Sequence, residues 1–229
     1  MKYFTIIQTR TSSSRLPAKC FLPMGGMPLV KLCFKRVSSL FSDTCVAISN
    51  DKSDDLLADY LKSSKISYFR GHLKNVLKRF TSLCLQSNLN PNDTVIRLTG
   101  DNPLVDNIFL ERMKRVWEKN NLDYLSAEPD NLIKYGWPKG LSAEFFRAQS
   151  LYEINSDEVD EYTKEHVTPS IKKYSNNSTN MAEFEKLGFF FKNNYGIDTL
   201  EDYLYVADLF QKTRWDESYI KILEFEKNI

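Results

Sequence analysis

This chain of 229 residues has few histidines, a net charge close to zero and no long apolar run. Two histidines, His72 and His166, are too few for a histidine-based zinc cluster. The longest apolar run, around residues 187–191, falls far short of the roughly 20 residues that a membrane-spanning helix needs. Lysine and arginine number 31 against 30 aspartates and glutamates, a formal net charge of +1, which argues against wrapping nucleic acid through bulk positive charge. We therefore expect neither a membrane nor a nucleic acid as partner.

Paired cysteines are also lacking. Cys20, Cys33, Cys45 and Cys84 form no C-x-x-C pair, and each sits in an apolar or helical setting where cysteine behaves as a small hydrophobe. Residues 1–7 have the pattern of a strand and lack the apolar region and cleavage site of a signal peptide. The sequence therefore predicts a reduced, cytoplasmic protein.

Strand and helix patterns alternate through the first 125 or so residues. Strands are predicted at 3–8, 45–49, 66–70, 94–98 and 123–126, and helices at 28–41, 54–63, 75–86 and 108–119. Strands separated by helices of this length indicate β-α-β units and a mostly parallel central sheet flanked by helices.

The pattern changes after residue 126. Prolines and glycines mark a long loop, followed by predicted strands at 144–146 and 189–192, helices at 162–174, 200–212 and 219–227, and a polar turn at 175–180. No linker is long enough to separate two domains. We expect one α/β domain over residues 1–229, with an elaborated second half over 127–229 after a first half over 1–126.

Three loops would follow strand ends at the ligand-binding edge of such a sheet: Thr9–Gly26, Arg70–Asn75 and Thr99–Asp106. The first places Arg10, Arg15 and Lys19 within ten residues among several hydroxyl side chains. Guanidinium and ammonium groups, with hydroxyls and backbone amides, suit a polyphosphate. The alternative is a solvated basic loop. Neither a P-loop nor a G-x-G-x-x-G pattern is present.

Two aspartates are candidate metal ligands. Asp101 follows the apolar strand at 94–98 and Gly100, and it is predicted either to hold Mg²⁺ or to cap the next turn. Asp198 precedes the helix at 200–212, where it is either the N-cap or a metal ligand, with Thr199 able to take the cap instead. Two weaker candidates are Glu144, between apolar residues, and His166, since a lone histidine is more often structural than catalytic.

The whole pattern resembles the SpsF-like cytidylyltransferases, relatives of the enzymes that activate acidic sugars. The resemblance rests on segments 6–10, 14–19, 22–29, 69–71, 75–80, 97–104, 140–144, 165–169 and 198–202 in the family's order. It implies a GT-A-like nucleotidyltransferase fold with CTP and Mg²⁺, in which residues 1–126 bind the nucleotide and 127–229 serve the acceptor and dimerisation. The implied metal ligands are Asp101 and Asp198, and the implied catalytic residues are Arg10, Arg15, Lys19 and Asp101. The implied nucleotide contacts are Gln8, Thr9, Arg10, Ser14, Arg15, Lys19, Arg70, Thr99 and Asp101, and the implied acceptor contacts are Arg79, Glu144 and His166.

The implied reaction transfers CMP from CTP to a small acidic sugar or related acid and releases pyrophosphate, in the biosynthesis of surface polysaccharides. The sequence departs from the family at Ser142, where an acidic residue is usual, and at Thr99, where several acidic-sugar enzymes carry glutamine. Two alternatives are a GT-A glycosyltransferase, which Asn102-Pro103 disfavours because no D-x-D motif follows Asp101, and a non-catalytic nucleotide-binding protein. The aromatic stretch 189–195 is interpreted either as a homodimer contact or as a core strand.

Overall fold

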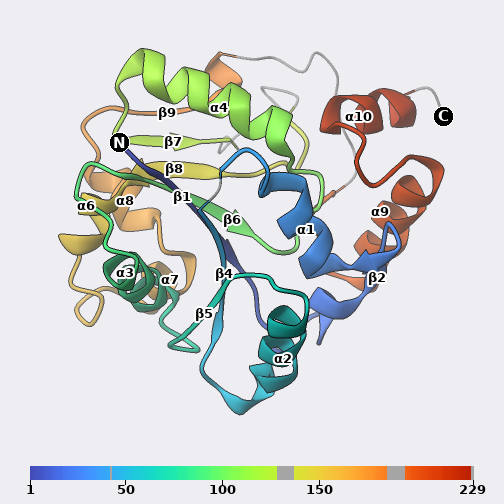
Figure 1. The fold of residues 1–229 in the computed structure, drawn as a ribbon. Coiled ribbons are helices and arrows are strands. Elements are labelled where there is room, and N and C mark those ends of the chain that lie inside the picture. The colour runs from blue at the N-terminus through green and yellow to red at the C-terminus, as the bar shows by residue number, and fades with distance from the viewer. Residues whose placement is uncertain (42, 128–136, 185–193, 228–229) are drawn as a thin grey trace.

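A seven-stranded mixed sheet forms the centre of the computed structural model, which describes residues 1–41, 43–127, 137–184 and 194–227 (Figure 1). The strand order is β5-β4-β1-β6-β8-β7-β9. The strands are β1 (Tyr3–Gln8), β4 (Thr44–Ser49), β5 (Tyr68–Gly71), β6 (Thr94–Thr99), β7 (Tyr124–Ser126), β8 (Glu144–Arg147) and β9 (Ser178–Asn180). β5, β4, β1 and β6 are parallel, and β8 runs antiparallel to β6 and β7. The predicted α/β class with a mostly parallel sheet is confirmed.

Helices cover both faces of this sheet (Figure 1). One face packs against α1 (Leu29–Val37), α2 (Asp55–Ser63), α4 (Asn107–Asn120), α9 (Leu200–Lys212) and α10 (Tyr219–Lys227). The other packs against α3 (Val76–Gln86), α6 (Ala148–Tyr152), α7 (Glu161–His166) and α8 (Pro169–Tyr174). Alternate strand side chains enter the two cores, so Ile7 belongs to the first and Ile6 to the second.

Short polar side chains fix where several helices begin. The Asn75 Oδ1 accepts from the amide of Lys78 at 2.8 Å at the start of α3. Thr199 and Asp202 form a reciprocal capping box at the start of α9. Each cap satisfies backbone donors that a helix N-terminus leaves unpaired, and each places the preceding loop at a defined angle.

The structure corrects several sequence predictions. The helix predicted at 162–174 is two helices, because Val167 adopts a positive φ of 68° and Pro169 starts α8. The helix predicted at 28–41 ends at Val37. The segment 175–180, predicted as a polar turn, contributes β9 to the sheet edge. The strand predicted at 189–192 lies outside the described residues.

A few short elements were not predicted. They are the two-stranded hairpin of β2 (Pro23–Met24) and β3 (Met27–Pro28), helix α6, and the 3₁₀ turns η1 (Lys19–Phe21), η2 (Lys52–Asp54) and η3 (Met181–Glu183). Among the described residues, no helix combines the length and the apolar character needed to cross a bilayer.

A buried ion pair in the first half of the chain is hydrogen-bonded to the segment that leads into α10 in the second half. The Arg36 guanidinium, on α1 and 1% exposed, lies 3.5 Å from the Asp106 carboxylate. It also donates to the carbonyls of Trp215 at 2.6 Å and Glu217 at 2.9 Å. Asp106 in turn accepts from the Tyr219 amide at 2.7 Å. Burial lowers the pKa of Arg36 and raises that of Asp106, so each charge depends on the other and on these hydrogen bonds.

We expect Asp106→Ala to lower the free energy of unfolding by about 3–5 kcal/mol, because it leaves the Arg36 charge buried without its partner. The substitution also removes the cap that accepts from the Phe109 amide at 2.8 Å. Urea denaturation measures the loss. The control is Asp208→Ala, which removes an exposed pair with Lys212 on α9 and costs about 0.5 kcal/mol or less. Equal stability of the two variants would contradict a structural role for the buried pair.

Candidate active site

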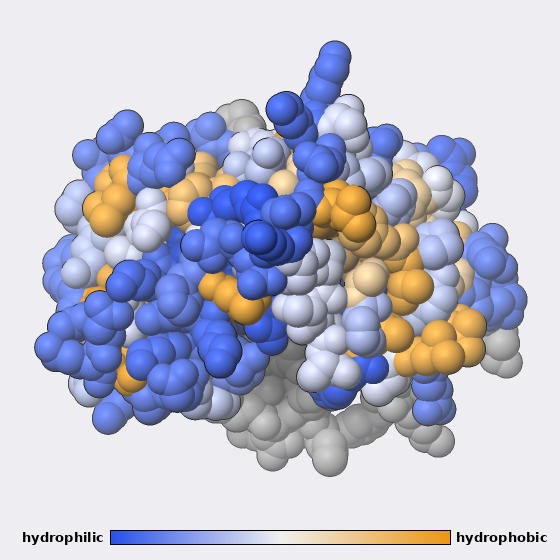
Figure 2. Space-filling view, turned by 90° about the horizontal axis from the view of Figure 1, so that it is seen from below, coloured by the Kyte–Doolittle hydropathy of each residue, from blue (hydrophilic) through white to orange (hydrophobic). Residues whose placement is uncertain are grey.

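A cavity of about 210 Å³ opens where β1 and β6 end. β1 runs downward from the N-terminus in Figure 1, and Figure 2, which views the molecule from below, shows a face that is mostly hydrophilic with small hydrophobic patches. The cavity is lined by the predicted residues Gln8, Thr9, Arg10, Ser14, Arg15, Lys19, Thr99, Asp101 and Asp198, with Ser13, Val76, Arg79, Gly100 and Glu165. The structure therefore brings together eight of the nine predicted nucleotide contacts and both predicted metal ligands.

The basic loop after β1 is held in place by one buried carboxylate. Asp54 Oδ1 accepts from the amide of Thr11 at 2.8 Å and from its hydroxyl at 2.7 Å. Asp54 Oδ2 accepts from the Ser49 amide at 2.8 Å. The Ala18 amide then donates to the Thr11 carbonyl at 2.8 Å, which closes the loop just before Lys19. These bonds hold the backbone at both ends of the segment that carries Arg15, so the loop is not a freely solvated chain.

Lys19 lies between the two candidate metal ligands. Its Nζ is 2.5 Å from Asp101 Oδ2 and 3.5 Å from Asp198 Oδ1, and it donates to the Ile197 carbonyl at 2.7 Å. Arg15 Nη2 lies 2.8 Å from the same Asp198 oxygen. Two carboxylates that are 97 positions apart in the sequence thus converge on one ammonium group.

Neither aspartate serves as a helix cap. Thr199 caps α9, with its hydroxyl accepting from the Asp202 amide at 3.2 Å, and Asp106 caps α4. Burial opposes ionisation of Asp202, but hydrogen bonds from Thr199 outweigh it and lower its pKa. The Asp101 and Asp198 side chains are therefore left to the cavity.

Gly100 allows the ends of β1 and β6 to meet. Its amide donates to the Gln8 carbonyl at 2.8 Å. A Cβ at this position would lie 2.9 Å from the Thr9 Cβ, closer than packed carbon atoms allow. The glycine thus places Thr9, Thr99 and Asp101 at the same end of the cavity.

Of two further predicted arginines, Arg70 lies outside the cavity lining and Arg79 is hydrogen-bonded to backbone carbonyls. Arg70 is absent from the cavity lining; its guanidinium donates to the Ser49 carbonyl at 3.1 Å and pairs with Asp55 at 2.7 Å. Arg79 does line the cavity, but it is buried and donates to the His72 carbonyl at 2.8 Å and the Leu73 carbonyl at 2.9 Å. Burial lowers its pKa to about 10. Arg79 therefore lies with the nucleotide candidates and apart from Glu144 and His166.

Glu144 and His166 line a second cavity, of about 520 Å³. The rings of His166 and Tyr162 lie 4.3 Å apart at its wall. The full lining is Arg97, Tyr124, Ser126, Ser142, Glu144, Tyr162, His166, Thr168, Pro169 and Lys172.

Sequence reasoning missed Arg97 and Glu165. Arg97 forms an ion pair with Glu144 and donates from Nε to Gln8 Oε1 at 3.0 Å, which connects the two cavities. The sequence does contain a signal for Arg97, since it is a charged residue inside an otherwise apolar strand. Glu165 lies 3.4 Å from Arg10 and had no comparable signal, because it precedes His166 on an exposed helix.

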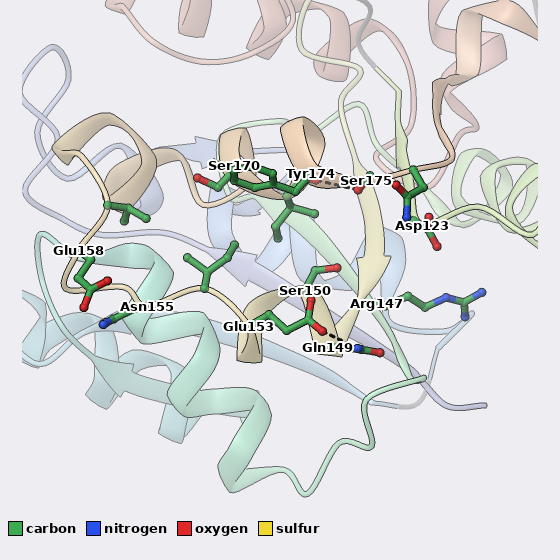
Figure 3. A pocket seen from close by; sticks show the side chains of 14 residues that line it. Asp123, Arg147, Gln149, Ser150, Glu153, Asn155, Glu158, Ser170, Tyr174 and Ser175 are labelled. Carbon is green, nitrogen blue, oxygen red and sulfur yellow. Dashed lines mark hydrogen bonds between the residues drawn. The ribbon is translucent and has the colours of Figure 1, made fainter.

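The most voluminous of the described cavities, about 720 Å³, contains none of the predicted site residues. It lies between α6, α8 and the loop that joins α6 to α7, beside Arg147 and Asp123 (Figure 3). Gln149 donates to Glu153 within it, and Arg147 extends away from Glu153 and Glu158 (Figure 3). Arg147 pairs with Thr94 at the start of β6, so this cavity lies at the sheet edge opposite the candidate active site.

A metal at the 210 Å³ cavity would need ligands besides protein side chains. Within the described ranges, no three His, Cys, Asp or Glu side chains are grouped to hold an ion. Asp101 and Asp198 supply two carboxylates to the same cavity. Two hard oxygen donors suit Mg²⁺, which keeps several waters and binds substrate phosphates.

The fold and this site agree with one family model, described as cytidylyltransferase, which matches residues 4–228. The chain belongs to the cytidylyltransferase family. It is 31% identical over 221 residues to the spore coat polysaccharide biosynthesis protein SpsF of Bacillus subtilis, covering 90% of this chain and 85% of that one. The structure of a cytidylyltransferase from Leptospira borgpetersenii covers 100% of this chain and 94% of its own, with a TM-score of 0.81 and 25% identity.

A further relative has a substrate in its name. The chain is 29% identical over 122 residues to the 8-amino-3,8-dideoxy-manno-octulosonate cytidylyltransferase of Shewanella frigidimarina, which is 52% of this chain and 49% of that enzyme. The predicted resemblance to SpsF-like cytidylyltransferases is confirmed, and so is the prediction of a nucleotidyltransferase.

We expect Asp54→Asn to loosen the cationic loop while the fold persists. An amide has one acceptor oxygen, so it cannot accept from both Thr11 and Ser49 as the two carboxylate oxygens do. The expected loss is about 1–3 kcal/mol for the donor left unpaired. Hydrogen exchange at the Thr11 amide should accelerate about tenfold or more.

The matched control is Asp51→Asn, three residues earlier, where the side chain accepts from the Ser53 amide at an exposed turn. This variant should leave exchange at Thr11 unchanged. Equal exchange at Thr11 in both variants and in the unsubstituted protein would show that Asp54 does not hold the loop.

Proposed function

We propose that the protein is a Mg²⁺-dependent cytidylyltransferase that transfers CMP from CTP to a small acidic sugar or related acid and releases pyrophosphate. The observation that carries the proposal is the convergence of Arg15, Lys19, Asp101 and Asp198 in one cavity at the ends of β1 and β6. The names of the relatives support the acceptor class and a place in surface polysaccharide biosynthesis.

The cationic loop would hold the triphosphate of CTP. Arg15 and Lys19 now neutralise Asp198 and Asp101, and Arg10 lies 3.4 Å from Glu165. Each cation thus has an exchangeable partner, so phosphate oxygens would compete with carboxylates for the same donors. Once bound, the cations stabilise the charge that accumulates on the departing pyrophosphate.

Asp101 and Asp198 would hold Mg²⁺. When bound, the ion neutralises phosphate charge and orients the phosphate oxygens. The two aspartates would fix the position of that positive charge, because the strand end before Asp101 and the helix start after Asp198 are held by their own hydrogen bonds. Lys19 would move from Asp101 to phosphate oxygen.

The remaining predicted contacts fall into two groups. Gln8, Thr9, Ser14 and Thr99 would contact the nucleotide from the ends of β1 and β6 and from the loop. Arg70 would reach it only after leaving Asp55, and Arg79 would act from the cavity wall.

Glu144 and His166 would serve the acceptor, which we place in the 520 Å³ cavity. Hydroxyl groups and cations in its lining suit an acidic polyol. We further propose a cytoplasmic location, since CTP is a cytoplasmic nucleotide and the four cysteines are free and buried. The homodimer remains the proposal that the family resemblance implies.

The test is pyrophosphate release from CTP and Mg²⁺ with a panel of 2-keto sugar acids. We expect Asp101→Asn and Asp198→Asn each to slow turnover about 10²- to 10³-fold, through lost stabilisation of developing charge. A chelator should abolish turnover, and added Mg²⁺ should restore it. Asp59→Asn, at an exposed position on α2, is the matched control and should retain full activity.

Two outcomes would overturn the proposal. Consumption of a nucleotide-sugar with CTP left intact would identify a glycosyltransferase. Binding of CTP that survives chelation, with no turnover for any acid, would identify a nucleotide-binding protein.

A further inference from the structure

A change from apolar to polar side chains crosses β6, β8 and β7 at one level of the sheet, while the neighbouring β1 stays apolar. Phe4, Val95, Phe146 and Tyr124 are neighbours in register and are buried in one core. Two residues along each strand, on the same face, the register instead aligns Ile6, Arg97, Glu144 and Ser126. Arg97 and Glu144 therefore mark where the core ends and the 520 Å³ cavity begins.

Glu144 already accepts from three donors. It accepts from the Tyr124 hydroxyl at 2.6 Å and the Thr168 hydroxyl at 2.6 Å, and it pairs with Arg97. Its side chain is 13% exposed. A carboxylate that already accepts from three donors has little capacity left for a ligand. The main role of Glu144 is therefore to hold the Arg97 guanidinium.

Arg97 has one nitrogen to spare. Nε donates to Gln8 Oε1 at 3.0 Å and Nη1 to Glu144. Within the described part of the chain, Nη2 has no hydrogen-bond partner, although the side chain is only 12% exposed and lines the cavity. A guanidinium fixed at two positions presents its third nitrogen with little loss of conformational entropy on binding.

The charges around this nitrogen favour an anion. Arg97 and Lys172 are the cations of the lining and Glu144 is its one carboxylate. The rest of the wall carries hydroxyl groups from Tyr124, Ser126, Ser142, Tyr162 and Thr168, beside His166. The lining combines the Arg97 guanidinium, whose Nη2 has no hydrogen-bond partner among the described residues, with several hydroxyls, which matches a carboxylate attached to a polyol.

We propose that Arg97 is a specificity-determining residue that binds the acceptor's carboxylate through Nη2, and that Glu144 is a positioning residue that holds the guanidinium. The inference rests on the proposed function, because it assigns the acceptor to this cavity. Gln8 lines the 210 Å³ cavity, so the Arg97–Gln8 hydrogen bond holds the carboxylate site at a fixed place relative to the nucleotide site.

The kinetic test uses Arg97→Lys and Arg97→Met, with pyrophosphate release measured at varied acid and varied CTP. We expect the KM for the acid to rise about 10- to 100-fold, the loss for one charge-assisted hydrogen bond, while the KM for CTP changes less than about threefold. Glu144→Gln should shift the KM for the acid in the same direction by a smaller factor. Arg147→Lys, a cation at the opposite end of β8, is the matched control and should change neither KM.

A second measurement does not depend on turnover and uses the Arg97→Lys variant only to assign a signal. The Nε–H signals of ¹⁵N-arginine are recorded in the unsubstituted protein with CTP, and the Arg97 signal is assigned by its loss in Arg97→Lys. We expect 3-deoxy-manno-octulosonate to shift this signal and its carboxamide to leave it unmoved, because the amide lacks the negative charge.

The outcomes separate the two proposals. Turnover with an acid, but with equal changes in both KM values or no response of the Arg97 signal, overturns the role of Arg97 and leaves the proposed function standing. A signal that responds to the acid alone, without turnover for any acid, supports carboxylate binding by Arg97 and overturns the proposed function. If no acid is turned over and the Arg97 signal does not respond, both proposals are overturned.

Discussion

The site depends on charge neutralisation by Lys19, which lies between two carboxylates, with Arg15 as a second partner of Asp198. Lys19 holds Asp101 at 2.5 Å and Asp198 at 3.5 Å, and these carboxylates arrive from opposite halves of the chain. Without a cation between them, two carboxylates facing one small cavity would repel each other. The same ammonium group is chemically suited to phosphate oxygen, so the contact that holds the two carboxylates together is also one that a nucleotide and its metal would replace.

The fold around this contact holds the backbone next to the charged residues in a defined position. Asp54 fixes the loop that carries Lys19, Gly100 allows the ends of β1 and β6 to meet, and Thr199 frees Asp198 by capping α9 in its place. Each device acts on the backbone next to a charged side chain. The charged side chains can then exchange partners without any change in the strands and helices that carry them.

The sequence predicted the part of this arrangement that follows from local pattern. Strand and helix periods placed the basic loop and Asp101 at the same edge of a parallel sheet, and the structure agrees. That Asp198 lies close to Asp101 was predicted only from the family resemblance, because no periodicity relates positions that are 97 residues apart. The positive φ at Val167 is set by tertiary packing and has no signal in the sequence, but Pro169 is a signal for a helix boundary that the prediction of one helix over 162–174 did not use. The pairing of Arg97 with Glu144 required the knowledge that β8 inserts antiparallel beside β6.

The buried contacts of Arg36 bear on how the molecule assembles during synthesis. Its guanidinium is satisfied by carbonyls at 215 and 217, and Lys19 by groups at 197 and 198. A nascent chain that has emerged only through α4 therefore has the Arg36–Asp106 pair without the carbonyls of residues 215 and 217, and it has Lys19 and Asp101 without Asp198. The α/β half can form its strands early, but these contacts of Arg36 and Lys19 are complete only once residues 197–217 have left the ribosome.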